Sequence, residues 1–269
     1  MKYSNHQKLN AFFLGTMIFS TLSLVACGAN KDIPKTAELE VSDIVNGKTV
    51  TKKNENAHSL VALVAEKNSG QSLCTGTIIA PGVVLTAAHC VDEAPQKLHI
   101  VFGLNIQKKT NKKDIREADK FVIHPNWGRH LPSGESDLAL IHFKGALPEG
   151  YSPVKLANDN LKLKIGQKVL MLGYGVTDGQ SESGSGKLRQ TNSFVLEEHS
   201  PTEIMTDGQK SSVCFGDSGG PAFVKVLKEY VQWGVASSVT NKSCNEASIH
   251  TEVMKYETWI KSSVSKMQH

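Results

Sequence analysis

A serine surrounded by glycines lies at the centre of segment 211–221, which reads Ser-Ser-Val-Cys-Phe-Gly-Asp-Ser-Gly-Gly-Pro. Acyl transfer by a serine needs the hydroxyl, a base that takes its proton, a group that orients the base, and donors that stabilise the oxyanion. Because glycine permits tight turns, the backbone can direct the N–H groups of Gly216 and Ser218 at one point. The segment predicts that Ser218 is a nucleophile beside an oxyanion hole, although such a motif taken alone could also be a loop.

Candidates for the base and for the group that orients it lie earlier in the chain. His89 comes near the end of segment 73–90, Leu-Cys-Thr-Gly-Thr-Ile-Ile-Ala-Pro-Gly-Val-Val-Leu-Thr-Ala-Ala-His-Cys. Histidine suits general acid–base catalysis because its pKa lies near neutrality, but a lone histidine is more often structural. Asp137 precedes the apolar run Leu138–Phe143, where an aspartate could equally be a turn residue or a cap. Each residue is therefore ambiguous by itself.

In combination, these segments resemble the trypsin/chymotrypsin family of serine endopeptidases. The chain order His89, Asp137, Ser218 is that of the chymotrypsin type and differs from the orders in subtilisin and the α/β-hydrolases. Segment 124–127, His-Pro-Asn-Trp, also resembles the family. The resemblance extends from Ile44 to the C-terminus.

The resemblance implies a fold and a role for each candidate. The fold is all-β, with two antiparallel six-stranded β-barrels at about 44–150 and 151–269, a C-terminal helix, and the triad between the barrels. His89 is then the general base and later the acid toward the leaving amine, while Asp137 fixes the histidine tautomer. The mechanism implied is hydrolysis of peptide bonds through an acyl-enzyme intermediate.

A segment that resembles the N-terminus of activated family members begins at Ile44. It reads Ile-Val-Asn-Gly, and Asn46 in place of the usual glycine is a mild change because Asn tolerates positive φ. In the family, cleavage frees this amine, which pairs with the aspartate before the nucleophile, here Asp217. A buried carboxylate needs a partner, so the motif predicts a zymogen activated before Ile44. Asp43 stands where arginine or lysine is common, so either a non-tryptic protease cuts there or the protein stays a zymogen.

The predicted specificity pocket departs from that of trypsin. The resemblance places Ser212 at its base, and a pocket without a buried anion gives lysine or arginine substrates no partner. It places segment 235–238 where the family usually has Ser-Trp-Gly, so that Ala236 would leave Asp137 without a usual hydroxyl partner. Serines in place of glycines would narrow the pocket. We expect a small or medium uncharged residue before the cut, in a pocket formed by Ser212, Val213, Ser238 and Ser248.

The elements that must position these residues are short and rich in β-formers. We expect strands at 60–65, 74–79, 83–86, 98–102, 138–143, 167–172, 193–196, 222–226 and 231–237. Residues 105–120 are rich in lysine and are predicted to form an exposed loop or edge hairpin. Helical spacing with Thr251 as the cap occurs near the C-terminus, in Val253, Tyr256, Ile260 and Val264. Many short strands with one terminal helix favour an all-β barrel or sandwich.

The N-terminus is typical of an exported protein. Basic residues precede an apolar run from Ala11 to Ala26, which is short for a membrane span of about 20 residues. The run leads into Leu-Val-Ala-Cys-Gly, which resembles the bacterial lipoprotein box and predicts lipidation of Cys27. An ordinary secretory peptide with an incidental cysteine is the alternative. We expect a signal peptide over 1–26, a tether or propeptide over 27–43 and a peptidase domain over 44–269.

The cysteine count agrees with a lipid anchor. Five cysteines is an odd number for an exported protein, and lipidation of Cys27 leaves four. An oxidising compartment permits two disulfides, and four cysteines by themselves allow three pairings. The family resemblance suggests the pairings Cys74–Cys90 and Cys214–Cys244.

Charge and motifs limit the partners. The net charge of +4 falls to +2 when Lys2 and Lys8 leave with the signal peptide, which is too little to argue for nucleic acid. The His-Glu-x-x-His pattern of zinc proteases does not occur, and we expect neither a metal nor a cofactor. The expected partners are protein or peptide substrates and, through the lipid, a membrane. We expect a monomer in a bacterial cell envelope, on its periplasmic or outer-surface face.

The sequence therefore predicts a serine endopeptidase, with two rivals left open. One rival is an inactive, protease-like envelope protein used for binding or as a scaffold, which the Asp43 junction and the altered pocket favour. Against it stands the complete triad, which a scaffold has no physical reason to keep. The other rival is an esterase that uses the same triad.

Overall fold

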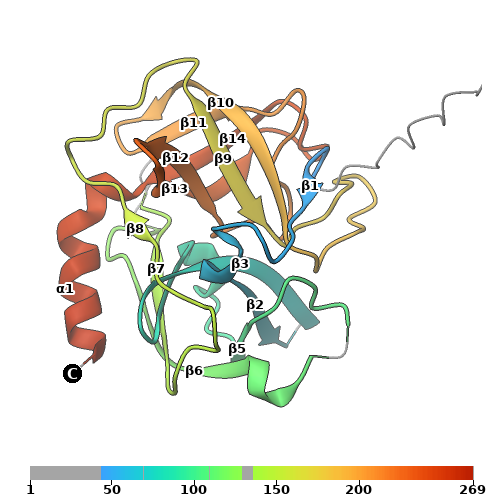
Figure 1. The fold of residues 1–269 in the computed structure, drawn as a ribbon, viewed down its shortest axis with the longest axis vertical. Coiled ribbons are helices and arrows are strands. Elements are labelled where there is room, and N and C mark those ends of the chain that lie inside the picture. Colours follow the sequence, from blue (N-terminus) through green and yellow to red (C-terminus); the bar gives the residue numbers. More distant parts are fainter. Residues whose placement is uncertain (1–43, 69, 109, 129–135, 269) are drawn as a thin grey trace, which may run out of the picture. The chain divides into compact units, whose positions relative to one another are not determined.

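Two closed antiparallel β-barrels make up most of this protein, as the sequence predicts (Figure 1). The computed structural model describes residues 44–68, 70–108, 110–128 and 136–268. The first barrel has the strand order β2-β3-β4-β7-β6-β5, and β5 pairs with β2 to close it. Its strands are β2 (Leu60–Lys67), β3 (Gly70–Ala80), β4 (Val83–Thr86), β5 (Lys97–Val101), β6 (Ile115–Ile123) and β7 (Ala139–Phe143).

The second barrel is the ring β9-β10-β11-β14-β13-β12. It closes because β9 pairs with both β10 and β12. Its strands are β9 (Lys168–Gly173), β10 (Arg189–Ser200), β11 (Glu203–Asp207), β12 (Pro221–Val226), β13 (Glu229–Val239) and β14 (Ala247–Glu252). Two short strands are attached to this ring: β1 (Lys48–Thr49) pairs with β10, and β8 (Lys155–Leu156) runs parallel to β13.

The helical elements are short, apart from the last one. The 3-10 turns are η1 (Ala57–Ser59), η2 (Ala88–Cys90), η3 (Lys112–Asp114) and η5 (Val253–Tyr256), and the α-helix is α1 (Glu257–Gln268). The helix contacts β7 of the first barrel and buries Ile260 and Met267. None of the helices in the described part of the chain is long and apolar enough to span a membrane.

Residue pattern explains why these segments are strands. All four residues of β4, Val-Val-Leu-Thr, are buried, so this strand is buried on both faces. The first half of β10 instead alternates, with Thr191, Ser193 and Val195 buried and their neighbours Asn192 and Phe194 exposed. Such period-two burial is expected of a strand with one face toward a core. Because two of these buried residues, Thr191 and Ser193, are polar, the inner face of β10 is marked by alternating burial and not by apolar composition.

Three details of the sequence-based expectation are wrong. Residues 115–120, predicted as part of a loop or hairpin, belong to β6, a ladder strand whose residues are all partly or fully exposed and so give no apolar signal. β11 and β14 fall outside the predicted strands, because each buries polar side chains, including Glu203, Thr206, Ser248 and His250. Thr251 lies within β14 and caps no helix, and Val253 and Tyr256 belong to η5, so the α-helix begins only at Glu257.

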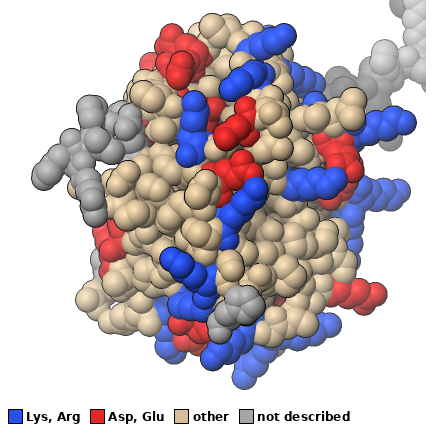
Figure 2. Space-filling model, turned by 90° about the vertical axis from the view of Figure 1, so that its left-hand side faces the viewer, with Lys and Arg blue, Asp and Glu red and all other residues tan. Residues whose placement is uncertain are grey.

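Charged side chains of both signs mix on the face shown in Figure 2, which is turned by 90° from the view of Figure 1. Lys155 and Glu229 form an ion pair of 2.5 Å, and Lys261 pairs with Glu257 on α1. Exposed pairs of this kind contribute little to stability. Residues 1–43, which carry the predicted signal peptide, Cys27 and the tether, lie outside the described residues.

Candidate active site

His89 lies in η2, directly after β4 of the first barrel. A disulfide between Cys90 and Cys74 ties this turn to β3, with an S–S length of 2.04 Å. The hydroxyl of Thr86, at the end of β4, donates to the carbonyl oxygen of Thr75 on β3 at 2.9 Å. These two links hold the histidine turn against the sheet, so the imidazole is carried by a rigid element.

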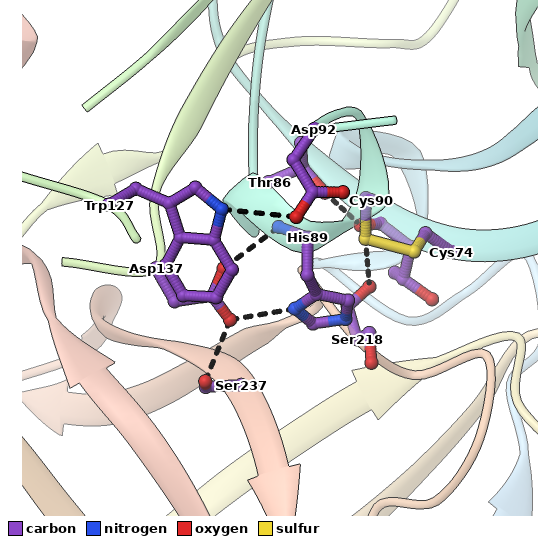
Figure 3. A network of polar contacts seen from close by, with 10 residues as sticks. Cys74, Thr86, His89, Cys90, Asp92, Trp127, Asp137, Ser218 and Ser237 are labelled. Atoms are coloured by element: carbon purple, nitrogen blue, oxygen red, sulfur yellow. Dashed lines mark hydrogen bonds and ion pairs between the residues drawn. A yellow bond between two sulfur atoms is a disulfide. The ribbon is translucent and has the colours of Figure 1, made fainter. Parts of the chain in front are cut away.

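Asp137 is 1% exposed and holds His89 at two points (Figure 3). Its Oδ1 accepts from the backbone N–H of His89 at 3.0 Å, and its Oδ2 lies 2.7 Å from the Nδ1 of the same residue. A carboxylate at this distance places the proton of neutral imidazole on Nδ1 and leaves Nε2 as the acceptor. The side chain therefore fixes both the position and the tautomer of the histidine.

A third donor reaches Asp137 from the second barrel. The hydroxyl of Ser237, on β13, donates to Oδ2 of Asp137 at 2.7 Å. The expectation that Ala236 would leave Asp137 without a hydroxyl partner is therefore wrong. Since the hydroxyl that contacts Asp137 is that of Ser237, the family's Ser-Trp-Gly run corresponds to residues 237–239. This is one residue later than the resemblance in sequence places it.

The surroundings of His89 favour its protonated form. Burial by itself would lower the pKa of His89, but the hydrogen bond and charge of Asp137, with a smaller contribution from Asp92, raise it above its ordinary value. Asp92 also accepts a hydrogen bond of 3.1 Å from the indole Nε1 of Trp127, whose ring centroid is 6.5 Å from that of His89. No motif singles out Asp92, which is three residues after the histidine.

Ser218 lies on the other side of the imidazole from Asp137 (Figure 3) and is partly exposed. Its carbonyl oxygen accepts from the N–H of Thr75 at 2.8 Å, which links the serine loop to the first barrel. Gly219 follows at φ +81°, and a Cβ there would come within 2.0 Å of Oγ1 of Thr86, so only glycine fits. His89 and Ser218 line one cavity of about 270 Å³.

The two amides of the predicted oxyanion hole are available to a ligand. Neighbouring amides are used inside the loop, since Asp217 N–H donates to the carbonyl oxygen of Cys214 at 2.9 Å and Gly219 N–H to that of Ala236 at 2.7 Å. Within the described residues, neither Gly216 nor Ser218 donates its N–H to a protein acceptor. Unused donors beside a nucleophile are what stabilisation of a developing oxyanion requires.

Asp217, between these two amides, is completely buried. Its Oδ1 accepts from Gly175 N–H at 2.7 Å and its Oδ2 from Cys214 N–H at 2.8 Å. Burial raises the pKa of this carboxyl to about 7, and the two amides and the charge of Arg189 oppose that rise only in part. The buried carboxylate is therefore short of positive charge.

The Ile44 segment, predicted to partner Asp217 after cleavage, is already docked. The side chain of Ile44 is completely buried, and the backbone adopts φ +68°, a conformation that a β-branched residue rarely takes. Val45 forms a bridge with Ser212, whose N–H donates to the Val45 carbonyl oxygen at 3.1 Å. This docking occurs in a sequence in which Ile44 follows Asp43 and so has no free ammonium.

The four residues predicted to form the specificity pocket fall into two layers. Val213 and Ser238 line the cavity together with Phe215, Ser237 and Val239, among others. Ser212 and Ser248 are completely buried, with their hydroxyl oxygens 2.8 Å apart. The Ser212 hydroxyl donates to the Val213 carbonyl oxygen at 2.8 Å, so the Ser248 hydroxyl donates to Ser212. The Ser212–Ser248 pair is thus neutral and internally satisfied, and neither residue lines the cavity directly. Val239 is a wall residue that the sequence did not single out.

The second disulfide joins Cys214, in the wall of this cavity, to Cys244. Both disulfides have the pairings that the family resemblance suggests. The sulfur atoms of Cys74 and Cys90 and a ring nitrogen of His89 lie close together, but a disulfide-bonded cysteine provides no thiolate for a metal.

Residues 44–260 match the family model described as Trypsin. The chain belongs to the trypsin family. That match covers both barrels, His89, Asp137 and Ser218.

Individual trypsin-family relatives are distant in sequence, and the match covers nearly all of some of them and about half of others. Chymotrypsin-like elastase family member 1 from Canis lupus familiaris is 25% identical over 260 residues, which cover 86% of this chain and 95% of the elastase. Chymotrypsin from Phaedon cochleariae is 26% identical over 269 residues, covering 89% and 92% respectively. Vitamin K-dependent protein C from Mus musculus is 27% identical over 254 residues; the match covers 83% of this chain and 52% of protein C, so the chain spans about half of that relative.

Proposed function

We propose that this trypsin-family protein is a serine endopeptidase. The observation that carries the proposal is the hydrogen-bonded chain from Ser237 through Asp137 to Nδ1 of His89, with Ser218 on the opposite side of the ring. This chain leaves Nε2 of His89 as a proton acceptor on the side of the cavity. Related proteins named elastase and chymotrypsin support the same reaction class.

The reaction proceeds in two halves. The Ser218 hydroxyl oxygen bonds to the carbonyl carbon of the substrate while Nε2 of His89 takes the hydroxyl proton. The amides of Gly216 and Ser218 donate to the carbonyl oxygen as it becomes negative. His89 passes its proton to the departing amine as the peptide bond breaks, and water then releases the acyl group by the same steps.

The cavity favours a small or medium uncharged side chain before the cut. Phe215 and Val239 line it. Ser212, predicted at the base of the pocket, is neutral and hydrogen-bonded to Ser248. No carboxylate among the lining residues could pair with a lysine or arginine substrate.

The place where the enzyme acts is proposed from the N-terminal sequence. A signal peptide over 1–26 exports the chain, Cys27 carries lipid, and 27–43 tethers the peptidase domain to a bacterial envelope membrane. Protein or peptide substrates outside the cytoplasm are then the partners, and cleavage before Ile44 is the proposed activation step. The three relatives named above are animal proteins and give this part of the proposal no support.

The proposal is tested by labelling the chain, cut before Ile44, with a fluorophosphonate that reacts with activated serines. The wild-type protein should gain the mass of one probe at Ser218, and Ser218→Ala should gain none. Ser152→Ala, which removes an exposed hydroxyl outside the cavity, should label like wild type. A peptide library should then be cut after small or medium uncharged residues. An unlabelled, properly folded cut protein that hydrolyses nothing would favour the scaffold hypothesis, and turnover of esters alone would favour an esterase.

A further inference from the structure

Asp217 needs a positive charge that the uncut chain does not supply through its N-terminus. Two backbone amides contact the carboxylate, at 2.7 and 2.8 Å, and both carry only partial charges. A buried carboxylate without a cation is costly, because the interior cannot replace its hydration. While Ile44 remains bonded to Asp43, the ammonium expected of the family is absent.

Arg189, like Asp217, is almost completely buried. It begins β10 and is 1% exposed, whereas arginine is almost never fully buried unless it is paired. Its Nη1 donates to the carbonyl oxygen of Gly175 at 3.2 Å and to that of Lys187 at 3.3 Å. These two carbonyl contacts orient the guanidinium.

The register of the second barrel directs Arg189 and Asp217 toward each other. Arg189 lies directly opposite Gly173 in the antiparallel β9–β10 ladder, and residues opposed in this way project to the same face. On that face of Gly173, a Cβ would come within 2.1 Å of Oδ1 of Asp217. The Asp217 carboxylate therefore fills the space that a side chain at 173 would take, on the face to which Arg189 projects.

Gly175 connects the two charged groups. Its N–H donates to Oδ1 of Asp217, and its carbonyl oxygen accepts from Nη1 of Arg189. Among the described residues, Arg189 is the charged group whose field acts on Asp217, and it lowers the pKa of that carboxyl against the larger effect of burial. One glycine thus lies between a buried cation and a buried anion, with a hydrogen bond to each.

The position of Asp217 determines the direction of the two oxyanion amides, because it stands between Gly216 and Ser218 in the chain. We propose that Arg189 is an internal counter-ion of Asp217 that holds the Gly216–Ser218 segment in its catalytic conformation while Ile44 is still bonded to Asp43. The inference rests on the proposed peptidase function. It makes Arg189 a positioning residue, and it gives the uncut chain activity of its own.

The test compares uncut and cut forms of the full chain. In one version the residues before Ile44 are replaced by the recognition sequence of a site-specific protease, and intact mass establishes which form is present. The uncut wild-type chain should label with fluorophosphonate and turn over a small-residue ester or peptide. Arg189→Gln should lower kcat of the uncut chain by about 100-fold with little change in KM, the effect expected when oxyanion stabilisation is lost.

Three further measurements separate positioning from a general structural role. Arg189→Lys, which keeps the charge, should retain most of the uncut activity. Lys187→Gln removes the same charge two residues away, from a partly exposed side chain, and should have no effect. Cutting before Ile44 should restore most of the activity of Arg189→Gln, because the new ammonium then replaces the lost cation.

The pH dependence of activity in the uncut Arg189→Gln chain tests whether Arg189 stabilises the ionised form of Asp217. Loss of the guanidinium should raise the pKa of Asp217, so activity should shift to higher pH. An uncut wild-type chain that stays inactive while the cut form labels would overturn the inference and leave the peptidase function intact. The inference also fails if Arg189→Gln matches wild type when uncut, or stays inactive after cutting. If the cut wild-type chain does not label, the peptidase function itself fails.

Discussion

Asp137 and Asp217 are two buried carboxylates of one candidate active site, and their surroundings differ in kind. Asp137 has three donors from two barrels: the N–H and Nδ1 of His89, and the hydroxyl of Ser237. Asp217 has two amides and, on the other side of Gly175, the charge of Arg189. Folding alone therefore completes the environment of Asp137. The environment of Asp217 instead depends on where a positive charge comes from.

The difference matches the proposed tasks of the two residues. Asp137 contacts a base that becomes a cation during each turnover, so its charge is used within the reaction. Asp217 contacts no reacting group, and its ionisation affects catalysis through the backbone of Gly216 and Ser218. A regulatory step can act on the second carboxylate without disturbing the first.

The largest expected effect comes from Asp137→Asn. The amide cannot hold the Nδ1–H tautomer, so kcat should fall by about 10⁴-fold with KM little changed. Loss of the negative charge also lowers the pKa of His89, which Asp137 raises, so the acid limb of the pH–rate profile should move to lower pH. The measurement is kcat against pH for the cut enzyme. An unchanged acid limb would mean that Asp137 does not control the ionisation of His89.

The second prediction concerns stability and Asp217. Its folded-state pKa of about 7 lies above the ordinary 3.8, so the folded chain holds this proton more tightly than the unfolded chain. The stability contributed by protonated Asp217 is therefore complete below about pH 4 and is lost as pH rises to about 7, by about 4 kcal/mol.

Urea unfolding of the uncut chain between pH 4 and pH 7.5 measures this effect. Asp217→Asn should remove that part of the slope of unfolding free energy against pH, whatever its absolute stability. Asp159→Asn, at an exposed aspartate, should keep the wild-type slope. Equal slopes in wild type and Asp217→Asn would show that Asp217 is adequately compensated in the uncut chain, and the contrast with Asp137 would disappear.

The smallest effect is expected for Ser237→Ala. It removes one of three donors to Asp137, which corresponds to about 1.4 kcal/mol or a tenfold loss in kcat/KM. In the Asp137→Asn background the same change should have almost no effect, because Ser237 acts through that carboxylate. Full additivity of the two changes would assign Ser237 to substrate binding instead.

The sequence anticipated the fold where strands were apolar and missed it where they were not. β4, with four buried residues, can be predicted directly from its sequence. β6 is partly or fully exposed throughout, and its residues 115–120 fall in the segment predicted as an exposed loop or edge hairpin. β14 buries the polar residues Ser248, His250 and Thr251, where apolar residues would be expected. Such polar residues fit there because of local partners; Thr206, for example, lies 3.0 Å from Nε2 of His250.

The sequence by itself determined the composition and chain order of the candidate triad, because His89 and Ser218 stand in long local motifs and Asp137 lies between them in the family's order. Only the tertiary structure decided which neighbours complete them. Ser237 meets Asp137 from the other barrel, Val239 enters the cavity wall, and Arg189 approaches Asp217 through the register of β9 and β10. These contacts join residues far apart in the chain, and a one-residue difference in alignment changes which side chain faces the site.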